Sequence, residues 1–117
     1  MPYVILPSAM AMLPCPHLNA QVELTAERER HIAEHHPDLL PAQRGLLDRV
    51  LADPDEVRWD ASYPSTRLFV RRFADAVAGR NVVVVVVTGE PPDTRHWIVT
   101  AFTSRRPPKG DVEWKRP

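Results

Sequence analysis

The sequence predicts an α+β domain in which two N-terminal helices pack on one face of a four-stranded antiparallel sheet. Two observations predict this class. Capping and proline signals, with an apolar stripe at helical spacing in the second segment, indicate two helices between residues 26 and 52, and from residue 56 onward the pattern changes to extended runs separated by short turns. Helices followed by consecutive strands are typical of α+β folds. A length of 117 residues with 44% hydrophobic content suits one domain with one core.

Both helices are expected in the first half of the chain. Thr25 is a good N-cap for a helix over residues 26–36, and Pro37 ends it because proline disfavours helical geometry in the residue before it. A second helix is expected over residues 41–52, with Pro41 in its first turn. Its apolar stripe consists of Leu46, Leu47, Val50 and Leu51. These residues should face the sheet.

The strands are expected mainly after the helices. Extended segments are predicted at residues 20–24, 57–60, 67–73, 82–87 and 96–104. Six consecutive valines fill 82–87 and cannot alternate between a buried and a solvated face, so this strand should be covered on both faces or lie at the centre of the sheet. We therefore expect it inside the sheet, between the strands that carry Arg71 and Thr100.

Residues 1–19 are expected to form a proline-rich N-terminal arm ahead of a single domain over residues 20–117. The prolines of its first sixteen residues are Pro2, Pro7, Pro14 and Pro16. Residues 1–16 should therefore lack regular structure or become ordered against another chain, and a homodimer through the arm would cover its apolar side chains. The basic C-terminal tail, 107–117, should be loose except where Trp114 packs.

Composition narrows the classes of function. The net charge is zero, but residues 1–57 hold four Lys/Arg against nine Asp/Glu, a net charge of −5, and residues 58–117 hold eleven against six, a net charge of +5. A basic half suits phosphate binding, although the two halves could equally pair with each other within the fold. Cys15 is the only cysteine, which fits a reducing, cytoplasmic location, and no stretch reads as a signal peptide or membrane anchor.

An ordered series of short motifs runs through residues 20–116. It consists of Val22-Glu23-Leu24-Thr25-Ala26-Glu27-Arg28, His31-Ile32, His36-Pro37, Asp53-Pro54-Asp55-Glu56-Val57, Leu68-Phe69-Val70-Arg71-Arg72, Val99-Thr100-Ala101-Phe102-Thr103, and Lys109-Gly110 with Trp114. The series resembles the phage-associated barnase-EndoU-colicin-RelE-like nuclease families. This resemblance implies a RelE/barnase-like fold and a metal-independent endoribonuclease, without a cofactor, that cleaves RNA by attack of the ribose 2′-OH on phosphate.

Such chemistry needs a proton-transfer group and cations beside the phosphate. His31 matches the helix histidine of the family and is the expected proton-transfer residue, with His35 or His96 as its partner. Arg71 matches the strand arginine, although the doublet with Arg72 leaves that match one residue uncertain. Thr100 is expected to donate a hydrogen bond to the phosphate. Further RNA-binding residues are expected at Arg67, Arg72, Arg105 and Lys109.

Other interpretations of the same residues stay open. His31, Glu34 and His35 also spell H-x-x-E-H, the arrangement of a class of zinc hydrolases, but the strand-rich sequence downstream offers no obvious third ligand. A non-catalytic member of the same fold would bind RNA or a protein partner. A ribonuclease of this kind could be the toxin of a toxin-antitoxin pair or of a mobile element, and its partner would then be a small acidic antitoxin or immunity protein.

Overall fold

The computed structural model describes residues 10–90, 92 and 95–117 of the chain. The helices are α1 (Ala26–His35) and α2 (Arg44–Ala52), and two short 3₁₀ turns are η1 (Pro16–Leu18) and η2 (Val77–Gly79). The strands are β1 (Met10–Cys15), β2 (Ala20–Thr25), β3 (Glu56–Trp59), β4 (Thr66–Arg72), β5 (Asn81–Thr88), β6 (His96–Ser104) and β7 (Val112–Lys115). No helix in this described part is long and apolar enough to span a membrane.

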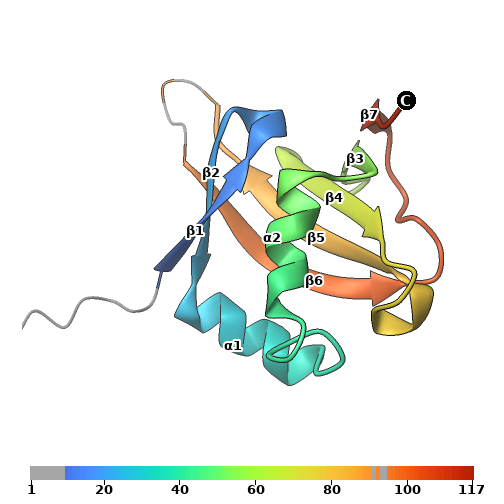
Figure 1. The fold of residues 1–117 in the computed structure, drawn as a ribbon. Helices are drawn as coiled ribbons and strands as arrows, with labels where there is room; N and C mark the ends of the chain where they lie inside the picture. Colours follow the sequence, from blue (N-terminus) through green and yellow to red (C-terminus); the bar gives the residue numbers. More distant parts are fainter. Residues whose placement is uncertain (1–9, 91, 93–94) are drawn as a thin grey trace, which may run out of the picture.

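The strands form one mixed sheet of seven, in the order β1-β2-β6-β5-β4-β3-β7 (Figure 1). The prediction of a four-stranded antiparallel sheet is therefore wrong. The four consecutive strands β3, β4, β5 and β6 do pair antiparallel, but two strands join beyond β6 and one beyond β3. The pair β2–β6 is parallel and consists of a single bridge between Glu23 and Trp97. That bridge makes the sheet mixed.

The expectation for the valine strand is confirmed. Strand β5 lies between β4 and β6 near the middle of the sheet, with Arg71 opposite Val82 and Thr100 opposite Val85. Val82, Val84 and Val86 point to the face that carries the helices and are fully buried. On the opposite face Val83 is fully buried, while Val85 and Val87 are only partly buried.

Both helices pack against the same core cluster on one face of the sheet, and in Figure 1 α2 crosses in front of the strands while α1 runs below them. Thr25 caps α1 by accepting a hydrogen bond from the backbone N–H of Arg28 at 3.2 Å, as its sequence position predicts. Helix α2 begins at Arg44 rather than Pro41, since residues 37–43 form turns that bury Leu39 and Leu40. The apolar stripe of α2 enters the main core, as predicted. We call this helix-bearing side the covered face.

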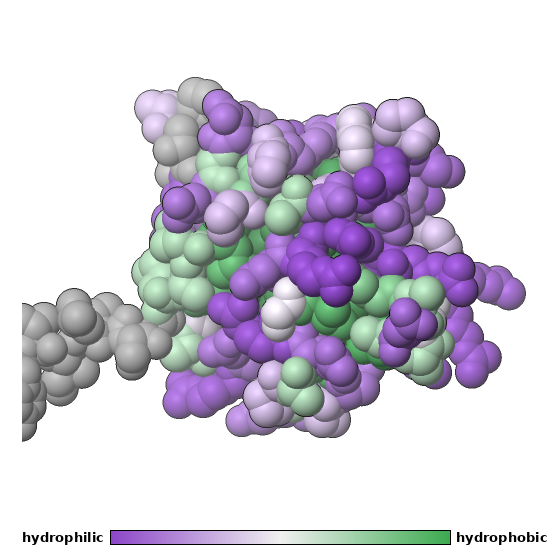
Figure 2. Space-filling model, in the orientation of Figure 1, coloured by the Kyte–Doolittle hydropathy of each residue, from purple (hydrophilic) through white to green (hydrophobic). Residues whose placement is uncertain are grey.

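Neither α1 nor α2 packs on the other side of the sheet, which we call the open face. A second apolar cluster lies there: Leu68, Val70, Val83, Val85 and Phe102. In Figure 2, drawn from the covered side, hydrophilic residues occupy most of the surface and a pale hydrophobic area lies around β1. The helices therefore shield the apolar side chains of the covered face, whereas neither helix shields the apolar cluster of the open face.

Two expectations about the chain ends need correction. Met10–Cys15 form strand β1, paired antiparallel with β2, and bury Leu13 and Cys15 in the core of the same chain, so the expected lack of regular structure in the arm is wrong for these residues. An edge strand tolerates the missing N–H of Pro14. Residues 1–9 lie outside the described part. In the tail, Val112–Lys115 form β7 on β3, while Trp114 packs against the core as predicted.

Candidate functional site

A hydrogen-bonded group of polar side chains lies at one end of the sheet, on the covered face. It consists of His17 from η1, Arg67 from β4, Thr88 from the end of β5 and Glu113 from β7. We call these four residues the His17 cluster. His17 and Glu113 are 96 positions apart in the sequence. Side chains from four separate elements therefore meet at one place.

Hydrogen bonds of ordinary length join the cluster. His17 Nε2 lies 2.7 Å from Glu113 Oε1. Arg67 binds the same carboxylate with two nitrogens, Nε to Oε1 at 2.8 Å and Nη2 to Oε2 at 3.0 Å. Its Nη1 donates to the Thr88 hydroxyl at 2.7 Å, and that hydroxyl donates to the Ser65 carbonyl at 2.9 Å. This bidentate geometry is the strongest form of an arginine–carboxylate pair.

The local sequence explains how these side chains reach each other. Pro16 begins the 3₁₀ turn between β1 and β2, and Asn19 ends it in the left-handed region at φ 51°, which places His17 at the tip of this hairpin. On the other side, the segment that leads into β7 passes close to the end of β3 at Gly110, beside Trp59. A Cβ atom at Gly110 would overlap the Trp59 carbonyl oxygen, so only glycine fits there.

Aromatic rings contact two of the cluster side chains, those of Arg67 and His17. The Arg67 guanidinium carbon lies 4.0 Å from the centre of the Trp59 ring, a cation–π contact. The His17 ring meets the buried Phe69 edge-on at 5.8 Å and lies 6.1 Å from the Trp114 ring. These contacts fix the rings in position, while the side chains of His17, Arg67 and Glu113 remain 20–22% exposed. A ligand in solution can therefore touch them.

The cluster keeps Glu113 ionised. Partial burial raises the pKa of this carboxyl, but the hydrogen bonds from Arg67 and His17 outweigh that effect and the pKa lies below its ordinary value of 4.5. Cys15 lies at the start of the same turn and behaves differently. Burial raises the pKa of its thiol above 9.0, so it stays an uncharged core residue.

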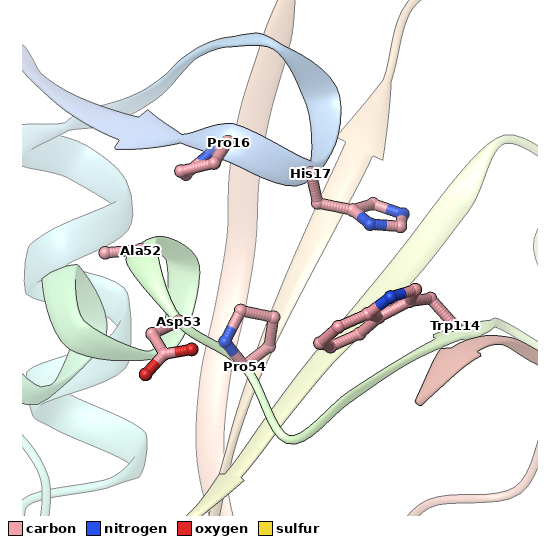
Figure 3. Close-up of a pocket in the computed structure, with 6 residues that line it drawn as sticks. All are labelled: Pro16, His17, Ala52, Asp53, Pro54 and Trp114. Atoms are coloured by element: carbon pink, nitrogen blue, oxygen red, sulfur yellow. The ribbon is translucent and has the colours of Figure 1, made fainter. Parts of the chain in front are cut away.

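A cleft opens beside the cluster. It has a volume of about 320 Å³ and is lined by Pro16, His17, Ala52, Asp53, Pro54 and Trp114. Figure 3 shows the His17 and Trp114 rings next to each other on one side, with Pro16, Pro54 and the Asp53 carboxylate across from them. Asp53 is held by Arg116 at 2.7 Å and by Arg71 at 3.5 Å. The cleft thus combines an imidazole, an indole and a paired carboxylate.

The residues expected from the sequence to form one site lie in different places. His31 and His35 lie on α1 with ring centres 4.2 Å apart, and the His35 Nδ1 donates to the His31 carbonyl at 2.8 Å. Desolvation, His35 and Arg28 together lower the pKa of His31 below 6.5, opposed by Glu34. No group of three His, Cys, Asp or Glu side chains in the described part could hold a metal ion, so H-x-x-E-H has no third protein ligand there.

Arg71 and Arg72, the arginine doublet of β4, lie on opposite faces of the sheet. Arg71 lies on the covered face, stacks on Phe73 at 5.1 Å and pairs with Asp53. Arg72 lies on the other side, where its Nε donates to the Gly79 carbonyl at 3.0 Å. The predicted shared face of Arg67, Phe69, Arg71 and Phe73 is confirmed. It is the covered face, on which Arg67 joins the His17 cluster.

Thr100 lies on the open face, opposite Val85, and therefore on the other side of the sheet from Arg71. It lines a hollow of about 550 Å³ whose other residues are Asp60, Tyr63, Pro64, Thr66, Val85, Val87 and Val99. The Thr100 Oγ1 is buried and has no hydrogen-bond partner among the residues that the structure describes. Its neighbour Val99 accepts a hydrogen bond from Arg28 of α1 at 3.4 Å.

The structure does not bring the remaining predicted site residues together with His31, Arg71 and Thr100. They are His96, Arg105 and Lys109. His96 is buried, and its Nδ1 accepts a hydrogen bond from the Gly89 N–H at 3.0 Å, which closes the turn between β5 and β6. Arg105 and Lys109 are exposed on the segment that leads to β7. The structure therefore does not gather His31, Arg71 and Thr100 on one concave surface.

Sequence reasoning missed His17 and Glu113. His17 lies in the proline-rich segment, where no regular structure is expected, and Glu113 lies in a tail that is expected to be loose. The available signal was the short run from Gly110 to Trp114, in which Val112 and Trp114 alternate with Asp111 and Glu113 as in a strand. No family model, no curated protein and no solved structure matches this chain.

Proposed function

We propose that this protein is a metal-independent ribonuclease whose proton-transfer group is His17, in the cleft between the N-terminal hairpin and β7. The observation that carries the proposal is the His17–Glu113–Arg67 arrangement, with an imidazole at 2.7 Å and a guanidinium at 2.8 Å from the same carboxylate oxygen. A histidine oriented by a carboxylate and standing beside a cation is what acid–base cleavage of a phosphodiester requires. The resemblance of the motif series to ribonuclease families supports the same chemistry.

Each residue has one role in this proposal. Glu113 binds His17 Nε2 and so orients the ring, which leaves Nδ1 to exchange a proton with the substrate. The ribose 2′-OH loses its proton to that nitrogen, the 2′-oxygen forms a bond to phosphorus, and the bond from phosphorus to the 5′-oxygen breaks. The imidazolium then returns the proton to the 5′-oxygen. The products are a 2′,3′-cyclic phosphate and a free 5′-hydroxyl.

Arg67 supplies charge to the phosphate. A guanidinium has five N–H donors, and the hydrogen bonds to Glu113 and Thr88 use three of them. Two donors therefore remain for phosphate oxygens, on an arginine already held in place by Trp59. The ring of Trp114 forms one wall of the cleft and offers a stacking surface to a base of the RNA.

The test is cleavage of a mixed RNA by the purified full chain in the presence of EDTA. His17→Ala should lower the rate about 10²-fold or more, and Glu113→Gln should lower it as well because the ring loses its orienting partner. Glu23→Gln is the matched control, since Glu23 makes an equivalent ion pair with Arg95 at 2.9 Å outside the cluster. The thermal midpoint of each variant shows that it is folded.

The same assay separates this site from the one expected from the sequence. If His31→Ala abolishes cleavage while His17→Ala does not, the site lies on α1 and our assignment is wrong. If wild-type protein binds RNA without cleaving it, the non-catalytic binding function takes its place. Co-purification of a small acidic protein that blocks the cleft would favour a toxin with an antitoxin or immunity partner in the cytoplasm.

A further inference from the structure

We propose that His31 and His35 of α1 form a bidentate surface site for a divalent transition-metal ion, with Cu²⁺ preferred over Ni²⁺ and Zn²⁺. The two residues are four positions apart on one helix, a spacing that puts both rings on the same face one turn apart. Their ring centres are 4.2 Å apart and their planes differ by 30°. Two imidazoles at this spacing are a known way to hold one ion.

The hydrogen bonding of His35 prepares it as a ligand. Its Nδ1 lies 2.8 Å from the His31 carbonyl oxygen, which can only accept, so Nδ1 carries the proton and Nε2 carries the lone pair. Metal-binding histidines commonly donate their second ring nitrogen to a backbone carbonyl in this way. The bond also fixes the orientation of the ring before any ion arrives, which lowers the entropic cost of binding.

The surroundings of the pair limit what the bound ion can do. The shallow surface beside His31 is lined by Glu27, Arg28, Arg30 and Glu34, whose formal charges cancel. Since no third His, Cys, Asp or Glu of the described part joins the pair, water completes the coordination shell. The site therefore binds an exchangeable ion at the surface and lacks the closed ligand set of a zinc hydrolase.

The preference among ions follows from ligand chemistry. Imidazole nitrogen suits copper, nickel and zinc, and affinity for a given nitrogen site rises from nickel to copper and falls again at zinc. Calcium and magnesium favour oxygen ligands and should not compete. The site is separate from the His17 cluster, because His31 and His35 are on α1 and none of the cluster residues is.

The experiment is calorimetric titration of the full chain with CuCl₂, NiCl₂ or ZnCl₂ at neutral pH in a buffer that does not chelate metal. The wild type should bind one ion per chain at this site. His31→Ala and His35→Ala should each weaken that binding about tenfold or more, because one remaining ring loses the benefit of a linked second ligand. His35→Gln, which keeps a polar side chain at the same exposed position, should weaken it equally.

His36→Ala is the matched control. His36 follows directly in the sequence, but it caps the helix and its ring lies 6.2 Å from Phe102 rather than beside His31. It should bind metal like the wild type. Equal affinity in the wild type, His31→Ala and His35→Ala overturns the proposal, and so does a loss confined to His36→Ala. RNA cleavage in EDTA reports on the proposed function independently, so failure of one proposal does not resemble failure of the other.

Discussion

Replacing Thr100 by valine should stabilise the protein. The Thr100 Oγ1 is buried and has no hydrogen-bond partner in the described part of the structure. A buried polar group left without a partner costs about 1–3 kcal/mol. Valine has nearly the same shape, keeps the β-branch that suits a strand and removes the hydroxyl. Its methyl group would lie among the valines that line the open-face hollow.

We expect the free energy of unfolding to rise by about 1 kcal/mol in Thr100→Val. For a domain of this size, that change corresponds to a thermal midpoint about 3–6 °C higher. Urea denaturation followed by circular dichroism measures it, and the m-value should not change because the surface exposed on unfolding is the same.

Thr88→Val is the control, since it makes the same chemical change at another buried strand threonine. The Thr88 hydroxyl accepts from Arg67 and donates to Ser65, so its loss leaves both groups without their partner. Stability should fall by about 1–3 kcal/mol. The reasoning is refuted if Thr100→Val is also destabilised, because the hydroxyl must then have a partner in the hollow. RNA cleavage by Thr100→Val should match the wild type if the His17 cluster is the site.

Three further outcomes are expected. Because the pKa of Glu113 is lowered in the fold, its contribution to stability is present above the ordinary value of 4.5 and is lost as the pH falls through the lower folded value, so urea midpoints of the wild type and Glu113→Gln should converge in acid. Gly110→Ala should lower the thermal midpoint and RNA cleavage together, because the new Cβ overlaps the Trp59 carbonyl oxygen and displaces β7, and a variant that keeps both would contradict this geometry. His96→Ala should lower the free energy of unfolding by about 1 kcal/mol, measured in urea, since the Gly89 N–H loses one of its two acceptors and keeps only the Arg95 carbonyl, and an unchanged midpoint would contradict that role.

The parts of the fold that the sequence predicted are those with a strong local signal. Thr25 and Pro37 bracket α1, and the valine run identified the central strand, because capping, proline geometry and two-sided burial act within a few residues. The extra strands escaped prediction for the opposite reason. Strand β1 is apolar at nearly every position and contains Pro14, so only its pairing with β2 makes it a strand.

The candidate site was harder to predict than the fold. Arg67 was expected to bind phosphate, and it does lie in the cluster, but His17 and Glu113 come from opposite ends of the described chain. Strands β1 and β2 lie at one end of the strand order and β7 at the other, so His17 can pair with Glu113 only because the tip of the β1–β2 hairpin reaches across the covered face, where His17 also contacts Phe69. No spacing rule along the sequence encodes such a contact. Conversely, His31 and Arg71 belonged to recognisable motifs, and that local signal carries no information about whether two side chains face one another.

His17 and Glu113 are 96 positions apart in the sequence, and this separation affects when their contact forms during folding. Closing so long a segment of chain costs conformational entropy, so this contact should form late in folding, after the antiparallel meander β3–β6. By the same reasoning it should be among the first to open, since only one backbone bridge joins β2 to β6 and β7 is an edge strand. Fraying of either edge would take the imidazole away from its carboxylate while the valine strand stayed folded. RNA cleavage would then depend on whether the sheet edges are folded. The loss of cleavage should correlate more closely with amide hydrogen exchange in β7 than with global unfolding.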